Sequence, residues 1–165
     1  MDHLESDEMK IRLAKSEDLK QIIDLLNEVT LHLIEKGIRQ WDYPWEENKV
    51  AAQIMHSSSY VLLINDEIIG VFCLSEIDYF NDLPVDAKSI YLSQIAILPE
   101  FQGGNLGSAI LDFAYSYAEK LNKTLYLDCW AGNEKLKDFY TRNGLESIGD
   151  FPEDDYFISI FQYKQ

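Results

Sequence analysis

The stretch Leu92–Ser108 reads LSQIAILPEFQGGNLGS and places an apolar run, a proline and a glycine-rich turn in direct succession. The apolar run is typical of a buried strand, and Pro99 ends it. A helix is expected directly after the turn, because apolar residues recur at helical spacing at Ile110, Leu111, Ala114 and Ala118. The first N–H groups of such a helix lack intrahelical partners and carry partial positive charge. The turn is therefore a candidate anion site.

The composition of this turn separates it from two common nucleotide-binding motifs. A P-loop ends in Gly-Lys-Ser/Thr, whereas Gly107-Ser108 lacks the lysine. A dinucleotide-binding fingerprint follows the first strand of its β-α-β unit, whereas this turn lies in the middle of the chain with a different glycine spacing. The glycines still allow a close backbone approach to phosphate oxygens.

The net charge of the chain limits the classes of molecule that it is expected to bind. The chain has 29 acidic and 14 basic residues, a formal net charge of −15. Nucleic acid is a poor partner for such a surface. The charge either attracts a cationic substrate such as an amine or serves solubility alone. A polyanionic ligand would need a local set of backbone donors.

Length and composition predict one domain over residues 9–165, preceded by a flexible acidic tail over residues 1–8. Apolar residues make up 47% of the chain, enough for a sizeable core. No apolar run approaches the roughly 18 residues of a membrane span, and the acidic N-terminus is unlike a secretory signal. We therefore expect a cytoplasmic protein without a membrane partner. Cys73 and Cys129 fit no metal or redox spacing and are expected to be buried free thiols.

Hydrophobic periodicity predicts the order β, α, α, β, β, β, α, β, α, β, β, which favours a mixed α/β fold with six or seven strands and about four helices. Ser16 is the expected N-cap of the first helix, and Gly37 its end. Asn65-Asp66-Glu67 predicts a tight hairpin. The acidic stretch Asp78–Ala87, which contains Pro84, is expected to be a loop. The remaining elements are expected at residues 9–13, 46–56, 60–64, 68–74, 89–98, 124–130, 133–142, 146–151 and 156–163.

The run Ile95–Ser108 resembles motif A of the GNAT acetyltransferase superfamily, in which a central strand and a proline lead into a Gln/Arg-x-x-Gly-x-Gly/Ala turn and a helix. The following motif B is matched by Asn133, Phe139-Tyr140 and Asn143-Gly144-Leu145. The resemblance covers residues 11–163 in element order and is specific across residues 92–145. Gln102 matches the first motif position and Gly107 the last. Asn105 stands where the family usually has a glycine, and asparagine tolerates the left-handed conformation better than most residues.

The resemblance implies acetyl-coenzyme A as co-substrate and two splayed central parallel strands. The backbone of the first of these strands, at Ile95, Ala96 and Ile97, would hold the pantetheine arm. The turn would hold the pyrophosphate through Gln102, Gly103, Gly104, Asn105, Leu106, Gly107 and Ser108. Asn133 would bond the pantetheine arm, and it also suits the N-cap of its own helix.

The implied reaction is direct attack of an amine on the acetyl thioester. Tyr140 matches the family tyrosine that acts on the leaving sulfur as a general acid. Its ordinary pKa of about 10 lies above the pKa of roughly 8.5 of a thiol. Proton donation to the leaving thiolate therefore costs free energy unless the site lowers the tyrosine pKa. The alternative is that Tyr140 only hydrogen-bonds the sulfur. Glu76 and Asp128 are the candidate general bases.

The sequence says less about the residues that would bind the amine that accepts the acetyl group. Trp41, Tyr43 and Trp45 form either an aromatic wall of a substrate pocket or a packed corner. The acidic stretch after residue 77 favours an amine, which is small or belongs to a peptide. No metal-ligand spacing occurs, and none of the patterns fixes the oligomeric state, for which a homodimer is one possibility. The alternative function is a catalytically weak acyl-coenzyme A sensor or interaction domain.

Overall fold

The computed structural model describes residues 8–38, 40–80 and 83–164. The expected acidic tail thus lies outside the described residues except for Glu8. The backbone N–H of Glu8 donates to the Asn65 side chain over 2.9 Å, and Asn65 returns a backbone bond to the Glu8 carbonyl. Glu8 is therefore tied to the hairpin that follows β2.

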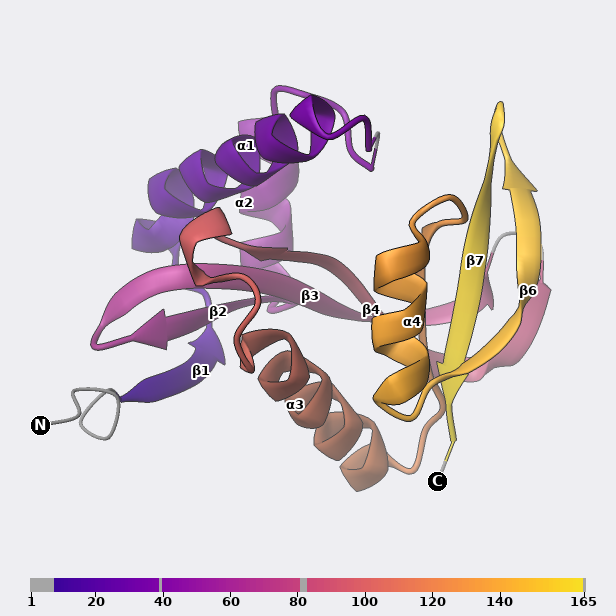
Figure 1. Ribbon diagram of the computed structural model, residues 1–165. Helices are drawn as coiled ribbons and strands as arrows, with labels where there is room; N and C mark the ends of the chain where they lie inside the picture. Colours follow the sequence, from indigo (N-terminus) through magenta and orange to yellow (C-terminus); the bar gives the residue numbers. More distant parts are fainter. Residues whose placement is uncertain (1–7, 39, 81–82, 165) are drawn as a thin grey trace, which may run out of the picture. The chain divides into compact units, whose positions relative to one another are not determined.

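The described residues form seven strands, four α-helices and two short 3-10 helices in the expected order (Figure 1). The strands are joined in one mixed sheet of order β1-β2-β3-β4-β5-β7-β6. The predicted fold class is confirmed. The elements are β1 Met9–Leu13, η2 Ser16–Asp18, α1 Leu19–Glu35, α2 Glu47–Met55, β2 Ser59–Ile64, β3 Glu67–Phe80, β4 Leu83–Ile97, η3 Pro99–Phe101, α3 Leu106–Leu121, β5 Leu125–Trp130, α4 Glu134–Arg142, β6 Glu146–Glu153 and β7 Tyr156–Tyr163.

The chain forms two compact units, each with its own core. The first contains β1, α1, α2, β2, β3 as far as Cys73, and the segment Gln94–Leu106. The second contains residues 74–93 and the chain from Gly107 onward. β3 and β4 each contribute residues to both units.

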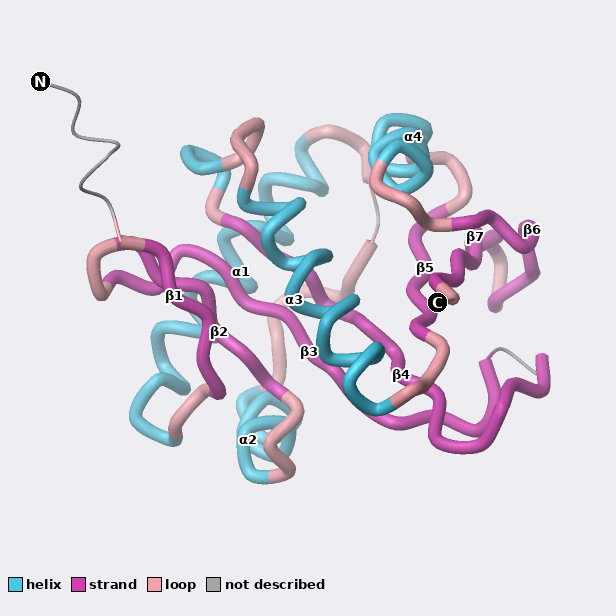
Figure 2. The backbone as a smooth tube through the Cα atoms, turned by 90° about the horizontal axis from the view of Figure 1, so that it is seen from below, coloured by secondary structure: helices cyan, strands magenta, loops and turns pink. Residues whose placement is uncertain are grey.

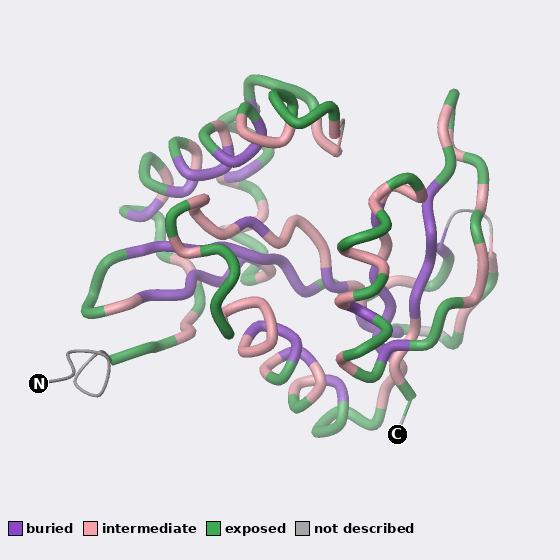
Figure 3. The backbone as a smooth tube through the Cα atoms, in the orientation of Figure 1, coloured by how far each residue is buried: buried purple, intermediate pink, exposed green. Residues whose placement is uncertain are grey.

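In the first unit, α1 and α2 pack on one face of β2 and β3. Leucine and isoleucine recur at helical spacing along α1, and alternate residues of the strands meet them. The shared core consists of Ile22, Leu25, Leu26, Val29, Trp45, Val50, Val61, Leu63, Ile68, Val71 and Ala96. Figure 3 shows β2 and the adjoining part of β3 as buried backbone.

The hairpin between β2 and β3 follows from its two turn residues. Asn65 and Asp66 have φ of 50° and 69°, and Ile64 pairs with Glu67 on either side of them. Two consecutive residues with positive φ match the twist of the strands, and Asn and Asp tolerate that conformation. The predicted hairpin is confirmed, and β2 and β3 run side by side in Figure 2.

The second unit packs aromatic residues from several strands. Phe80 contacts the rings of Tyr91 and Tyr126 edge to face, at centroid distances of 4.8 and 6.1 Å. Ile158 and Ile160 of β7 complete this cluster. Within the same unit α3 buries Ile110, Leu111, Ala114 and Ala118, which are the four residues predicted for its apolar face.

The parallel pairing of β4 with β5 is short. Ile90 pairs with Leu125 and Tyr91 with Tyr126, and no further pair of these two strands is recorded among the described residues. β4 nevertheless continues to Ile97, and β5 continues to Trp130 by pairing with β7 instead. Parallel neighbours need a crossover connection, which α3 supplies.

The expectation of a loop at Asp78–Ala87 is wrong. β3 extends to Phe80 and β4 begins at Leu83, while residues 81 and 82 lie outside the described residues. The acidic composition reflects the exposed face of these strand ends, whereas Ile77, Phe80 and Val85 pack into the second core. Pro84 is tolerated because it is the second residue of its strand.

Ser16 is not the N-cap of the first helix. It begins the 3-10 turn η2, and Asp18 is the N-cap residue of α1 without a side-chain hydrogen bond to that helix. The Asp18 carboxylate instead accepts the backbone N–H of Lys15, the N-cap of η2, over 2.8 Å. Arg12 donates to the same carboxylate over 2.8 Å. Burial raises the pKa of Asp18, but these hydrogen bonds outweigh it, so the net pKa is lowered. At the far end, Gly37 has φ of 80° and terminates the helix as predicted.

Cys73 and Cys129 are buried free thiols, as predicted. None of the helices in the described ranges is long and apolar enough to cross a membrane.

We predict that Asp18→Asn lowers the free energy of unfolding by about 2 kcal/mol at pH 7, because a buried carboxylate with two donors is lost. Since the folded pKa is lowered, the stabilisation is complete above the unfolded pKa of about 3.9 and is lost as the pH falls through the folded pKa. Urea denaturation at pH 7 and pH 2 should therefore show a gap between wild type and variant that closes in acid.

Asp24→Asn is the matched control, since its exposed pair with Lys20 on α1 is worth less than about 0.5 kcal/mol. Equal losses in the two variants at pH 7 would contradict a structural role for the Asp18 carboxylate.

Candidate functional site

The glycine-rich turn is exposed and joins β4 to α3. The 3-10 turn η3 follows Pro99, Gln102 returns to extended backbone, and Gly103 takes φ of 87° before α3 begins at Leu106. Gln102 donates its side-chain amide to the Ile97 carbonyl over 2.8 Å, which ties the turn to the end of its own strand. The local order predicted from the sequence is therefore present.

The two glycines of the turn leave room above the backbone. A Cβ on Gly103 would meet nothing within 4 Å, and one on Gly104 would meet only the Phe101 carbonyl at 4.0 Å. The left-handed residue is Gly103, and Asn105 is absent from the positive-φ residues of the described chain. Asn105 therefore does not use its tolerance of that conformation, because the left-handed residue of the turn lies two positions earlier.

The last motif glycine has a packing role. A Cβ on Gly107 would lie 3.1 Å from the ring of Phe139 on α4. The neighbouring Ser108 hydroxyl donates to the Asn143 side chain over 3.1 Å, and the Tyr115 hydroxyl donates to the Asn143 carbonyl over 2.7 Å. The N-terminus of α3 is therefore fixed against the C-terminus of α4.

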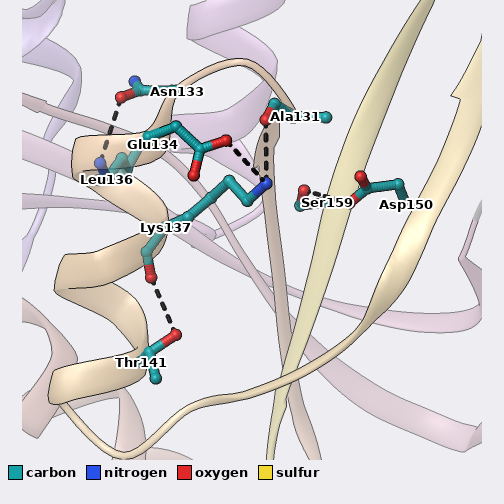
Figure 4. A network of polar contacts seen from close by, with 8 residues as sticks. All are labelled: Ala131, Asn133, Glu134, Leu136, Lys137, Thr141, Asp150 and Ser159. Carbon is teal, nitrogen blue, oxygen red and sulfur yellow. Dashed lines mark hydrogen bonds and ion pairs between the residues drawn. The ribbon is translucent and has the colours of Figure 1, made fainter.

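Asn133 caps α4, as one of its two predicted roles requires. Its side-chain oxygen accepts the backbone N–H of Leu136 over 3.2 Å (Figure 4). Lys137 closes the preceding loop by donating to the Ala131 carbonyl over 3.1 Å, close to the carboxylate of Glu134. The pantetheine-binding role of Asn133 stays a prediction.

The three strand residues predicted to hold the pantetheine arm lie at the end of β4. Ala96 belongs to the first core, whereas Ile95 and Ile97 are half-buried. The carbonyl of Ile97 already accepts the Gln102 side chain, and the N–H of Leu98 donates to Ile69. Ligand binding by this backbone stays a prediction.

Tyr140 lies in the interior of the second unit with 4% of its surface exposed. Its ring contacts Phe161 edge to face at 5.4 Å. Burial raises the pKa of Tyr140 well above its ordinary value, and the nearby groups of Cys129 and Asp128 raise it further. Among the described residues no hydrogen bond of its hydroxyl to protein is recorded. The site thus raises this pKa instead of lowering it.

Asp128 on β5 is the more enclosed of the two candidate bases. Tyr91 on β4 donates its hydroxyl to the carboxylate over 2.9 Å. Burial raises the pKa of Asp128 to about 6, with the Tyr91 bond opposing and Glu153 adding to the rise. Asp128 is therefore mostly ionised at pH 7 and able to take a proton. Glu76, by contrast, is exposed on β3.

The three aromatic residues before α2 differ in their surroundings. Trp45 is a core residue whose indole N–H donates to Thr30 over 2.9 Å. Trp41 packs edge to face on it at 5.5 Å, while Tyr43 is 47% exposed. A substrate-binding role for these residues stays a prediction.

Gln94 on β4 has unusual geometry that the sequence analysis did not predict. It has φ of 57° inside β4, a left-handed conformation rare for glutamine in a strand. Its amide nitrogen lies 3.1 Å from the Cys73 sulfur, and its buried Oε1 has no hydrogen-bond partner. The only sequence signal was a long polar side chain in an apolar run. Across the described residues no cluster of three or more metal-ligating side chains occurs.

Two sequence comparisons relate this chain to the same kind of protein. The model of the acetyltransferase (GNAT) family matches residues 20–145. The chain is 28% identical over 145 residues to the uncharacterized N-acetyltransferase YesJ of Bacillus subtilis (strain 168), covering 82% of this chain and 81% of that protein.

Two solved structures illustrate the likeness of the fold. One is a GNAT-family acetyltransferase of Listeria monocytogenes, with a TM-score of 0.78, 21% identity and 95% of each chain covered. The other is a putative acetyltransferase of Salmonella typhimurium with its cofactor acetyl-CoA, with a TM-score of 0.72, 17% identity, and 94% of this chain and 93% of that chain covered.

We predict that Gly107→Ala lowers the free energy of unfolding by about 1 kcal/mol, because the new methyl group presses on the Phe139 ring. Phe139→Leu makes room for it, so the two changes should be coupled in a double-mutant cycle measured by urea denaturation. Strictly additive losses would show that Gly107 is not required for this packing.

Proposed function

Because the chain belongs to the GNAT acetyltransferase family, we propose that it transfers the acetyl group of acetyl-coenzyme A to a primary amine. The observation that carries this proposal is the enclosed Asp128, held by Tyr91, with Tyr140 within electrostatic range. A base and a sulfur-facing hydroxyl are the two side-chain functions that direct attack by an amine requires.

The turn before α3 suits the coenzyme's pyrophosphate. Gln102–Asn105 is exposed, the backbone of Gly103 and Gly104 is open to close approach, and the first N–H groups of α3 follow. Backbone donors allow a protein with a net charge of −15 to hold a polyanion locally. The remaining proposed contacts to the coenzyme come from Leu106, Gly107, Ser108, Asn133 and the backbone of Ile95–Ile97. The related Salmonella protein was solved with acetyl-CoA, which supports this choice.

Asp128 serves as the base in this proposal. Bound acetyl-coenzyme A supplies the thioester, whose C–S bond is replaced by a C–N bond while the amine proton passes to the carboxylate. A base with a pKa of about 6 is ionised at neutral pH and still releases its proton readily to solvent. The Tyr91 hydroxyl holds the carboxylate in place through the 2.9 Å bond.

Tyr140 acts by hydrogen bonding in this proposal. Its raised pKa makes complete proton transfer to a thiolate unfavourable, whereas a buried hydroxyl donates a strong hydrogen bond to a developing negative charge. The freed thiolate then takes its proton from solvent. Tyr140 also favours the enzyme over an acyl-coenzyme A sensor, because a sensor has no need for a hydroxyl directed at the leaving sulfur.

The proposed acceptor is a small amine or the amine of a peptide. The acidic surface attracts cations, and the exposed Tyr43 with the half-buried Trp41 offers aromatic surface for an alkylammonium group.

We predict that Gly104→Glu raises the dissociation constant for acetyl-coenzyme A at least tenfold, because a carboxylate then faces the pyrophosphate. The fold should tolerate the change, since a Cβ has room there and an acid at a helix N-terminus is favourable. Calorimetric titration measures the affinity, and a thermal melt checks the fold.

Gly104→Ala is the matched control and should bind within about twofold of wild type, because its methyl group carries no charge. A wild-type protein that fails to bind acetyl-coenzyme A at millimolar concentration would overturn the proposed function.

We predict that kcat rises with pH around a midpoint near 6, and that Asp128→Asn removes this rise and lowers kcat about a hundredfold. The sign follows from the base acting in its ionised form. The measurement is free-thiol release from acetyl-coenzyme A with saturating amine across pH 5–9. If Glu76→Gln, and not Asp128→Asn, removes the rise, Glu76 is the base.

A further inference from the structure

Asn143 directly follows α4 and forms hydrogen bonds through four of its atoms. Its side-chain nitrogen donates to the Phe139 carbonyl over 2.8 Å, and its backbone N–H donates to the carbonyls of Phe139 and Tyr140, each over 3.1 Å. Its backbone carbonyl accepts the Tyr115 hydroxyl over 2.7 Å. The fourth atom, Oδ1, accepts the Ser108 hydroxyl over 3.1 Å. Two of these atoms therefore bind α3, and all five residues belong to the second unit.

The chemistry of these groups decides which atom donates in the bond between Ser108 and Asn143. A backbone carbonyl only accepts hydrogen bonds, so the side-chain nitrogen of Asn143, and not its oxygen, must face the Phe139 carbonyl. The side-chain oxygen consequently faces Ser108, and the Ser108 hydroxyl must be the donor. A serine hydroxyl carries a single hydrogen, which is thus used within the protein.

This assignment limits how Ser108 can contact a coenzyme at the proposed pyrophosphate site. Ionised phosphate oxygens only accept hydrogen bonds, so the Ser108 hydroxyl cannot donate to one of them while it donates to Asn143. The backbone N–H of Ser108 belongs to the third residue of α3, where N–H groups have no intrahelical acceptor. The backbone, and not the hydroxyl, is therefore the available donor.

A second contact holds the same turn of α3 against α4. A Cβ on Gly107 would lie 3.1 Å from the Phe139 ring, so the backbone of α3 approaches that ring closely. Gly107 and Ser108 are consecutive, and their two contacts reach the same end of α4. Donors that are fixed before a ligand arrives bind it more tightly than donors that must be ordered on binding. Contacts with α4 can therefore determine how well the start of α3 holds an anion.

We propose that Asn143 is a positioning residue for the coenzyme's pyrophosphate. It holds the Ser108 hydroxyl toward α4 and thereby fixes the first turn of α3, whose backbone N–H groups bind the phosphate oxygens. Ser108 then contacts the coenzyme through its backbone N–H alone. This inference rests on the proposed binding of acetyl-coenzyme A.

The test is a double-mutant cycle on the dissociation constant for acetyl-coenzyme A, measured by calorimetric titration of Ser108→Ala, Asn143→Ala and the double variant. Each single variant removes the same hydrogen bond and should raise Kd about fivefold, within the range expected for one neutral hydrogen bond. The double variant should also lie near about fivefold instead of about 25-fold, because the bond is already lost in each single variant. A thermal melt of each variant checks the fold.

Thr141→Ala is the matched control on the same helix. It removes a hydrogen bond from an exposed side chain to the Lys137 carbonyl, 3.0 Å long, and it should leave Kd within about twofold of wild type. If Asn143→Ala does not fold, Tyr115→Phe takes its place in the cycle, because it removes the bond to the Asn143 carbonyl. The same coupling to Ser108→Ala is then expected.

A raised Kd in Ser108→Ala with an unchanged or lowered Kd in Asn143→Ala would show that the hydroxyl itself binds the pyrophosphate, and the inference would be wrong. Losses that multiply in the double variant would also overturn it. Unchanged dissociation constants with lowered melting temperatures would assign Asn143 a purely structural role and overturn this inference alone. A wild type that does not bind acetyl-coenzyme A overturns the proposed function, and the role of Asn143 with it.

Discussion

The parallel pairing of β4 with β5 is the constraint from which the rest of the candidate site follows. Because parallel strands cannot be joined by a hairpin, the chain must cross over, and α3 is that crossover. Its N-terminus consequently lies directly after the end of β4, where the glycine turn exposes backbone donors. The pairing holds only at Ile90 and Tyr91, yet it brings Tyr91 of β4 within 2.9 Å of Asp128 of β5. One short ladder thus underlies both the crossover and the enclosed carboxylate.

The fold and the motif turn were predictable because their signals are local. Helical spacing on α1 and α3, the Asn65-Asp66 turn and the Gly37 helix end each depend on a few neighbouring residues. The loop predicted after residue 77 is wrong because the strands formed there are stabilised by Phe80 packing on Tyr91 and Tyr126, which are distant in sequence. The predicted Ser16 cap is wrong for a related reason, because the Asp18 carboxylate at the N-cap of α1 bonds to Arg12 on β1, a partner outside the local pattern.

The candidate site likewise has features that the sequence predicted and features that only the folded chain reveals. Gly103 and Gly107 were recognisable as motif positions, but their different roles, one conformational and one set by the Phe139 ring, depend on the folded chain. The pKa values of Asp128 and Tyr140 arise from burial and from groups on other elements, so no sequence pattern reveals their direction.

The net charge of the chain affects the proposed binding of both the coenzyme and the acceptor amine. A chain with a net charge of −15 opposes a polyanionic coenzyme and attracts a cationic acceptor. In the proposed function, uncharged backbone N–H groups at the start of α3 hold the pyrophosphate despite this repulsion. No basic residues are needed for this, so the surface stays acidic. The attraction creates a second difficulty, because acids hold an amine in its protonated form. In the proposed function, Asp128 with its raised pKa answers this difficulty by taking the proton that the attacking nitrogen releases.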